Sequence, residues 1–254
     1  SEFEMNLLRN EFNISKELLF YLPFLEKIET QESRIKTKEL EERKDFVFIG
    51  NFIHEPNWQT VLYLKKNIWP KIKSKLPQAK LNIYGAYPTQ KVWDLHNEKE
   101  GFLVHGKVEN ALEVIEDARI LLAPIPFGAG QKGKFIDAMQ TGTPIATNSI
   151  GAESMFSDLI SGIIDNEEDE FISKTIELYQ NENLWIKSQR NGFIILKEKF
   201  NKNDFAKEFY QRILDLELNL NELRKRNFIG QILKSNSANA LKYMSLWIEE
   251  KNRA

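Results

Sequence analysis

The chain has 254 residues, of which 35 are Lys or Arg and 37 are Asp or Glu, and its formal net charge is -2. This balance gives no reason to expect nucleic acid as a partner, because nucleic-acid-binding domains carry an excess of basic residues. Cysteine is absent, which excludes disulfides, thiolate metal sites and cysteine nucleophiles. No apolar stretch approaches the ~20 residues that span a bilayer, and the first residues lack an apolar signal core. We therefore expect a cytoplasmic protein, with contact at the inner membrane surface left open.

Two kinds of segment make up residues 1–44. Residues 1–27 are predicted to form a short helix and then a strand. Leu7, Leu8 and Phe12 follow helical spacing, and LLFYLPF (18–24) is an apolar run of strand length. Residues 28–44 are charged and nearly free of apolar side chains, which is typical of a linker or a solvated helix.

Apolar runs alternate with helical patterns over residues 45–165. The predicted strands are 46–50, 80–85, 102–106, 119–124, 144–148 and 159–165, and the first three end in glycine. Strands of this kind indicate a parallel sheet that is covered by helices on both faces. We therefore predict an α/β fold with a doubly wound, six-stranded, Rossmann-like sheet.

Several helices between these strands carry start, stop or kink signals. Pro70 is expected to kink or split the helix that follows the first strand, because proline removes a helix hydrogen bond. Asn110 and Glu113 have the spacing of a capping box at a helix start. Gly142 should end the helix that begins near Lys134. Beyond residue 166 the pattern predicts helices to the end of the chain.

The last stretch, residues 221–254, is basic and amphipathic, with seven Lys or Arg against three Glu. Two interpretations remain open. The helix can pack its apolar side chains against the rest of the protein or a missing domain, or it can make peripheral contact with anionic lipid.

The segment PFGAGQKGKFIDAM (126–139) is a glycine-rich loop that leads from the fourth strand into a helix. A helix N-terminus presents free N–H groups and a positive dipole end, which together attract anions. Glycine lets the backbone approach a ligand, as at Gly130, and Lys132 and Lys134 add positive charge. These features suit a diphosphate, and the alternative is a tight strand–helix turn with solvated lysines.

Other chemistries fit the same residues less well. Gly128, Gly130 and Gly133 satisfy the dinucleotide pattern G-x-G-x-x-G, but that fingerprint belongs after the first strand of its unit. The pattern of a P-loop also requires Ser or Thr after Lys134, where this chain has Phe135. The three histidines, His54, His96 and His105, show no metal-ligand spacing.

The order of these segments resembles the C-terminal, donor-binding domain of GT-B-fold glycosyltransferases of the group 1 type. The resemblance rests on FVFIGNFIHEPN, LNIYGAYP, FLVHGKVEN and ARILLAPIPFGAGQKGKFIDAMQTGTPIATNSIGAE. It covers roughly residues 45–200, which it implies to be a nucleotide-sugar-binding domain. Residues 1–44 would then be a remnant of the interdomain junction and linker, and residues 201–254 C-terminal helices.

The resemblance implies roles for nine residues in a nucleotide-diphosphate-sugar site. The loop after the first strand, with Gly50 and Asn51, would approach the diphosphate. Gly106, Lys107 and Val108 would lie near the base and contact it through the backbone. Gly130, Lys132 and Lys134 would hold the diphosphate, and Asp137 would bind the ribose hydroxyls, since a carboxylate accepts hydrogen bonds from both hydroxyls of a diol.

The resemblance further implies metal-independent, retaining transfer without a cofactor, onto a glycan, lipid or protein acceptor, as in polysaccharide biosynthesis. Many relatives have two glutamates in this region, but here Ala129 stands at the first position and Asp137 at the second. The acceptor-binding N-terminal domain of the family has no counterpart here, so we expect a separate domain or partner chain and assign no catalytic residue. A partner-binding module of the same fold and, less favoured, an NAD-dependent enzyme are the alternatives.

Overall fold

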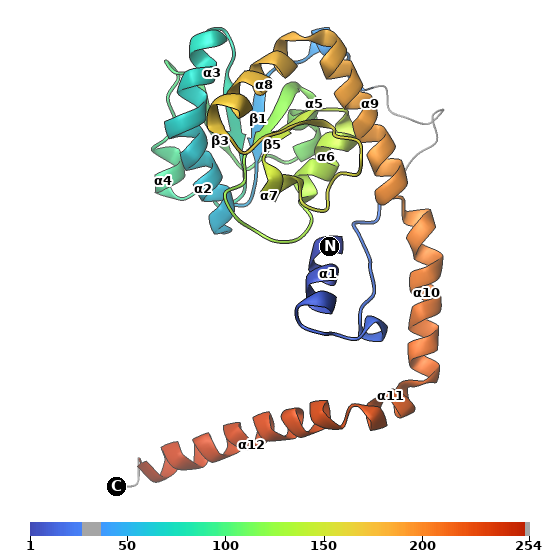
Figure 1. Ribbon diagram of the computed structural model, residues 1–254. Helices are drawn as coiled ribbons and strands as arrows, with labels where there is room; N and C mark the ends of the chain where they lie inside the picture. The colour runs from blue at the N-terminus through green and yellow to red at the C-terminus, as the bar shows by residue number, and fades with distance from the viewer. Residues whose placement is uncertain (27–36, 252–254) are drawn as a thin grey trace. The chain divides into compact units, whose positions relative to one another are not determined.

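The computed structural model describes residues 1–26 and 37–251 (Figure 1). The chain divides into two compact units, Ser1–Lys202 and Asn203–Ala254. Much of the charged segment predicted at residues 28–44 lies outside the described residues. Its described end contains a short 3₁₀ helix, η2 (Leu40–Glu42).

The first unit is built on a six-stranded parallel sheet. Its strands have the spatial order β3-β2-β1-β4-β5-β6, and every neighbouring pair is parallel. The strands are β1 (Lys44–Ile49), β2 (Leu81–Tyr84), β3 (Phe102–Gly106), β4 (Ala118–Ala123), β5 (Ile145–Thr147) and β6 (Gly162–Ile164). The predicted sheet is therefore confirmed, and its order is that of a doubly wound dinucleotide-binding fold.

Helices cover both faces of this sheet, which explains why its central strands are apolar on both sides (Figure 1). In β1, Phe46, Val47 and Phe48 are fully buried. On one face, α3 (Trp69–Lys75) packs against α8 (Glu168–Gln180), and on the other, α6 (Gly133–Thr141) packs against α5 (Ala111–Glu116) and α9 (Glu182–Lys199). The short helices α4 (Gln90–Trp93) and α7 (Ser149–Ala152) follow β2 and β5.

The expected interruption at Pro70 takes the form of a wide turn. Between α2 (Glu55–Tyr63) and α3 lies a π-helical segment, η3 (Leu64–Ile68), in which the Trp69 N–H donates to the Leu64 carbonyl five residues earlier. Proline has no N–H to continue the α-helical pattern. The chain thus stays helical across Pro70 at the cost of one π turn.

The other helix signals act where the sequence placed them. The Asn110 side chain caps α5 by accepting a hydrogen bond from the Leu112 N–H at 3.1 Å, and its amide donates to Glu113 at 2.7 Å. Gly142 ends α6 in the left-handed conformation with φ 70°. Both predicted helix boundaries are confirmed.

The strand predicted at residues 18–24 is wrong, although the helix before it is confirmed as α1 (Glu2–Asn10). A 3₁₀ helix, η1 (Lys16–Leu18), is followed by residues 19–26, which belong to no strand, and a single bridge joins Glu26 to Asn201. Pro23 has no N–H to donate to a strand ladder. The Phe24 N–H donates instead to the Gln131 side chain at 2.9 Å.

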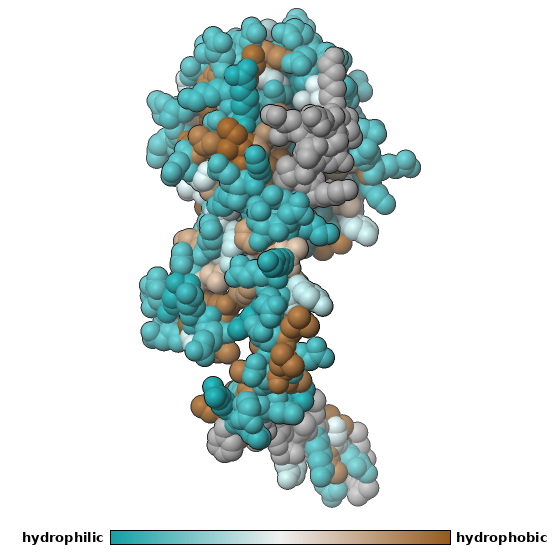
Figure 2. Space-filling model, turned by 90° about the vertical axis from the view of Figure 1, so that its right-hand side faces the viewer, coloured by the Kyte–Doolittle hydropathy of each residue, from teal (hydrophilic) through white to brown (hydrophobic). Residues whose placement is uncertain are grey.

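The second unit consists of helices, as predicted for the end of the chain. They are α10 (Lys202–Leu218), α11 (Leu220–Arg226) and α12 (Phe228–Lys251). Figure 2 shows hydrophobic side chains breaking the hydrophilic surface along the C-terminal helices. More than half of the surface is exposed in Leu218, Ile229, Leu233 and Trp247. No helix within residues 1–26 and 37–251 is long and apolar enough to cross a membrane.

Candidate functional site

The strand order places the candidate site at the carboxyl ends of β1 and β4. Connections run outward from β1 toward β3 in one half of the sheet and from β4 toward β6 in the other. Open α/β sheets bind ligands in the crevice where the order reverses. The loops that meet there are the one after β1, which contains Gly50 and Asn51, and the glycine-rich loop after β4.

In the loop after β1, a side chain at Gly50 would require the Asn57 amide to move. A Cβ at this position would lie 2.7 Å from Cγ of Asn57. The Asn57 side-chain amide donates to the Asn51 carbonyl at 2.8 Å, and the Asn51 side chain accepts from the Ile53 N–H at 2.9 Å. Asn57 thus braces the turn that holds Gly50 and Asn51.

Lys134 reaches from the first turn of α6 to this same loop. Its Nζ donates to Oδ1 of Asn57 at 2.7 Å and lies 4.2 Å from the centre of the Phe48 ring. Burial around the ammonium lowers the pKa of Lys134 to about 7, because desolvation disfavours the charged form. The structure therefore brings Lys134 and the Gly50–Asn51 loop together through one side chain, that of Asn57.

Lys132 is turned back into its own loop. The residue is buried, and its Nζ donates to the Gly130 carbonyl at 2.7 Å. Its backbone N–H points to the Met155 sulfur at 3.1 Å. Burial lowers the pKa of Lys132, and the nearby Glu153 and Glu4 carboxylates oppose that change. Gly130 has φ 76°, a conformation that glycine adopts without strain.

Asp137 lies one turn further along α6. Burial, and then the negative charge of Glu26, raise the pKa of its carboxyl group. Among the described residues its carboxylate has no hydrogen-bond partner. A half-buried carboxylate in this state gains from a ligand that offers hydroxyl donors.

The remaining predicted residues lie at the end of β3, two strands from β1. Gly106 has φ 75°, and a Cβ there would lie 2.9 Å from the Trp93 ring. Lys107 is exposed and Val108 is half-buried. The structure shows no contact between this group and Lys134, so a ligand that used both would have to extend along the edge of the sheet.

The side chains of His96 and His105 have hydrogen-bond partners, whereas that of His54 makes no cap hydrogen bond. The His105 ring lies 2.9 Å from Oδ1 of Asn82 and stacks on Tyr84 with ring centres 4.7 Å apart. His54 is the N-cap residue of α2, and His96 accepts from the Val104 N–H. In the part of the chain that the structure describes, no group of His, Asp or Glu side chains has the arrangement of a metal site.

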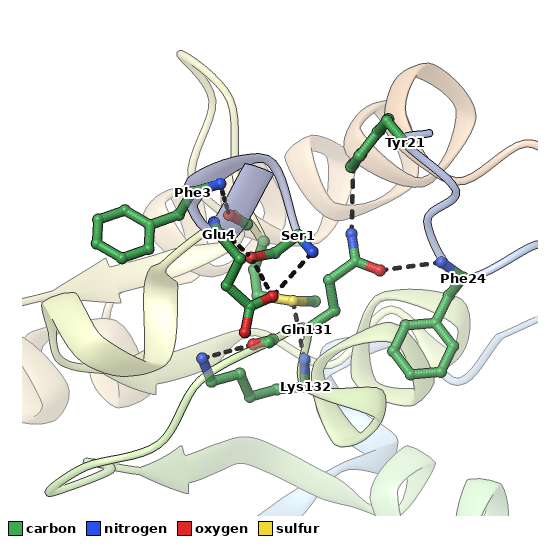
Figure 3. Close-up of polar contacts among 10 residues, drawn as sticks. Ser1, Phe3, Glu4, Tyr21, Phe24, Gln131 and Lys132 are labelled. Carbon is green, nitrogen blue, oxygen red and sulfur yellow. Dashed lines mark hydrogen bonds and ion pairs between the residues drawn. The ribbon is translucent and has the colours of Figure 1, made fainter. Parts of the chain in front are cut away.

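The N-terminal segment contacts the glycine-rich loop, which the sequence did not indicate (Figure 3). The Gln131 side chain accepts from the Phe24 N–H and donates to the Tyr21 hydroxyl at 3.3 Å. The Phe3 N–H donates to Ser154 at 3.2 Å. These pairings join residues more than 100 positions apart, so no local pattern could reveal them.

Asn57 is the second feature that sequence reasoning missed. It lies in the first turn of α2, directly after Pro56, and the sequence analysis assigned it no role. Its partner Lys134 is known only once β1 and β4 are neighbours.

The fold is that of a doubly wound α/β domain, and the comparisons give the family. Residues 43–181 match the family described as glycosyl transferases group 1. This match covers more than half of the chain, which therefore belongs to that family of glycosyltransferases. No curated protein sequence matches the chain significantly.

Several solved structures share the fold. A mutant of S. aureus TarM, in complex with fondaparinux, alpha-GlcNAc-glycerol and UDP, has a TM-score of 0.68 and 16% identity over 84% of this chain and 42% of its own. The pneumococcal O-GlcNAc transferase GtfA, in complex with UDP and GlcNAc, has a TM-score of 0.62 and 12% identity over 85% and 44%. A glycosyltransferase from Rickettsia africae has a TM-score of 0.63 and 15% identity over 84% and 62%. The chain thus spans less than two thirds of the length of each of these proteins.

Proposed function

We propose that this chain is the donor-binding part of a glycosyltransferase and binds a nucleotide-diphosphate sugar at the carboxyl ends of β1 and β4. The observation that carries the proposal is the meeting of the Gly50–Asn51 loop, Lys134 and the N-terminus of α6 at the point where the strand order reverses. Backbone N–H groups, a helix dipole and a lysine are the groups that bind phosphate in proteins. TarM and GtfA, which share the fold, were both solved with UDP.

Each predicted residue then has a definite task. Gly50, Asn51 and Gly130 offer backbone to the diphosphate, and Lys132 and Lys134 offer charge. Asp137 receives the ribose hydroxyls, which relieves its desolvated carboxylate. The backbone of Gly106, Lys107 and Val108 contacts the base.

The acceptor side belongs to a separate domain or partner chain. Transfer requires donor and acceptor to be held together, and the proximity of the two supplies much of the rate. We therefore propose that this chain alone binds the donor but transfers sugar poorly, and that the complete enzyme is cytoplasmic, metal-independent and retaining. The basic C-terminal helix is proposed to contact the partner domain or an anionic membrane surface.

Calorimetric titration of the chain with UDP, GDP and ADP tests donor binding. We expect saturable binding of one nucleotide, unaffected by EDTA. Substitution of Lys134 by Ala should weaken that binding by more than ~1 kcal/mol, the scale of a charge-assisted hydrogen bond. Lys99→Ala is the matched control, since Lys99 is exposed in the loop before β3.

The outcomes separate the candidate functions. Equal affinity in wild type and Lys134→Ala would remove the diphosphate from this loop. Absence of binding by all three nucleotides, together with capture of an acceptor-domain protein, would favour the partner-binding module. A change in NADH fluorescence on titration would favour the dinucleotide enzyme.

A further inference from the structure

The surroundings of Lys134 disfavour the charged form of its amine, which has a single polar partner among the described residues. Its Nζ donates to Asn57, lies over the Phe48 ring, and has no ion pair among residues 1–26 and 37–251. It also sits in the first turn of α6, where the helix dipole is positive and disfavours a cation. Asp137 is the acidic residue of α6 and lies one turn away, and burial alone accounts for the lowered pKa of Lys134.

Asn57 is suited to this position because its carboxamide has two different ends. The oxygen accepts from Lys134, and the NH₂ group donates to the Asn51 carbonyl. The same amide lies within 3.0 Å of where a Cβ of Gly50 would be, so it packs directly against the loop. A carboxylate could not donate to Asn51, and an alanine could do neither.

We propose that Asn57 is the positioning residue of the diphosphate site, and that it sets both the place and the charge state of the Lys134 amine beneath the Gly50–Asn51 loop. This inference rests on the proposed donor site but adds a residue and a mode of regulation to it. The neutral amide leaves the amine free to gain a proton when an anion arrives. Donor binding is then coupled to proton uptake by Lys134.

The coupling fixes the sign of the pH dependence. An anion favours protonated Lys134, so affinity for a nucleoside diphosphate is greatest below pH 7 and falls as pH rises through the pKa of the free protein. In Asn57→Asp the new carboxylate supplies a permanent counter-charge in place of the amide. The amine then stays protonated to higher pH, and the fall in affinity moves upward, while the added negative charge lowers the maximum affinity by about tenfold.

Two measurements on the full chain test this. In the first, competitive acetylation with mass-spectrometric readout gives the pH at which Lys134 loses its proton, without any nucleotide. In the second, calorimetry gives the affinities for UDP, GDP and ADP between about pH 5.5 and 9. This range brackets the titration of the Lys134 amine in the protein without nucleotide. Variants Asn57→Asp and Asn57→Ala are compared with Asn181→Asp, which changes the N-cap of α9 in the same chemical way at an exposed position.

In Asn57→Asp, we expect the pH at which Lys134 loses its proton to rise by more than one unit, and the pH profile of nucleotide affinity to move upward with it. In Asn181→Asp, we expect no shift in the Lys134 titration. In Asn57→Ala, affinity should fall at every pH although circular dichroism stays native. An unchanged Lys134 titration in Asn57→Asp would overturn the inference. If the titration shifts but wild type binds no nucleotide, the donor-binding proposal fails while the Asn57–Lys134 coupling stands.

Discussion

The amine of Lys134 is desolvated beside the Phe48 ring at the positive end of α6, and both the burial and the helix dipole favour its neutral form. This has a consequence for folding as well as binding. In the unfolded chain Lys134 keeps an ordinary pKa of 10.5, whereas in the folded protein the pKa is about 7. Between these values the unfolded chain binds more protons than the folded protein. Burial of Lys134 therefore lowers the free energy of unfolding by its full amount below pH 7. This destabilisation diminishes as pH rises from 7 toward 10.5.

Substitution of Lys134 by Met should therefore stabilise the protein at pH 6 by roughly 1–3 kcal/mol, after allowance for partial solvent access. The gain should shrink toward zero near pH 10. Urea unfolding of both proteins at pH 6, 8 and 10 measures the difference, and effects common to both proteins cancel. A gain that is the same at all three values would show that Lys134 keeps its charge in the folded state.

At the scale of single elements, α6 has a glycine at each end, and the two positions differ in backbone conformation and in the space for a side chain. Gly142 has φ 70°, and a Cβ there would also lie 2.8 Å from the Phe193 ring. Gly133 has no such constraint, since the nearest atom to its Cβ would be Phe24 Cζ at 3.9 Å. The two positions therefore form a matched pair for the same substitution.

Gly142→Ala should destabilise the first unit by about 1–3 kcal/mol, from left-handed strain and crowding together. Gly133→Ala should be neutral or slightly stabilising, because alanine is the better helix former. Thermal unfolding of the two variants beside wild type provides the measurement. Equal effects at both ends would mean that α6 ends elsewhere in solution.

The sheet could be predicted because each of its strands is a short apolar run, and β1 is a typical example with three fully buried residues. The run at 18–24 is equally apolar but has no neighbouring strand to pair with, so it does not form a strand. Its sequence could not reveal this, because strand pairing depends on the whole sheet. The glycines and lysines of the candidate site were visible for the same local reason. Asn57 and Gln131 were not, since Asn57 pairs with Lys134, and Gln131 with Tyr21 and Phe24, across large distances in the sequence.

At the scale of the molecule, the two units differ in how much they bury. The first contains the apolar core, whereas α10 and α11 have no fully buried residue. Segments with few buried apolar contacts open at low free-energy cost. Brief trypsin treatment should therefore cut within residues 203–251 before it cuts the sheet, and leave a resistant fragment that ends near Lys202.

Mass spectrometry of the digest identifies that fragment, and circular dichroism of the product should keep its α/β signature. Early cuts within the sheet region, at Lys80 for example, would contradict the division. Anionic vesicles added before digestion also test the proposed membrane contact. Slower cleavage in their presence, but not with neutral vesicles, is the expected result.

The π turn ahead of Pro70 shifts the phase of the helix that contains it. A regular α-helix advances about 100° per residue. On that count the Trp69 side chain would point about 80° away from the direction of Val61, and so would lie beside the buried face that contains Leu64 and Ile72. One wide turn delays the winding by close to a whole residue and returns the indole to the core, where its Nε1 donates to the Glu100 carbonyl at 2.8 Å. On the same count, removal of a single residue from Leu64–Ile68 would convert the wide turn to a regular α-helical turn and leave Trp69 facing the core. An alignment gap of one position here would thus mark the loss of the π turn, with the same side chain turned inward.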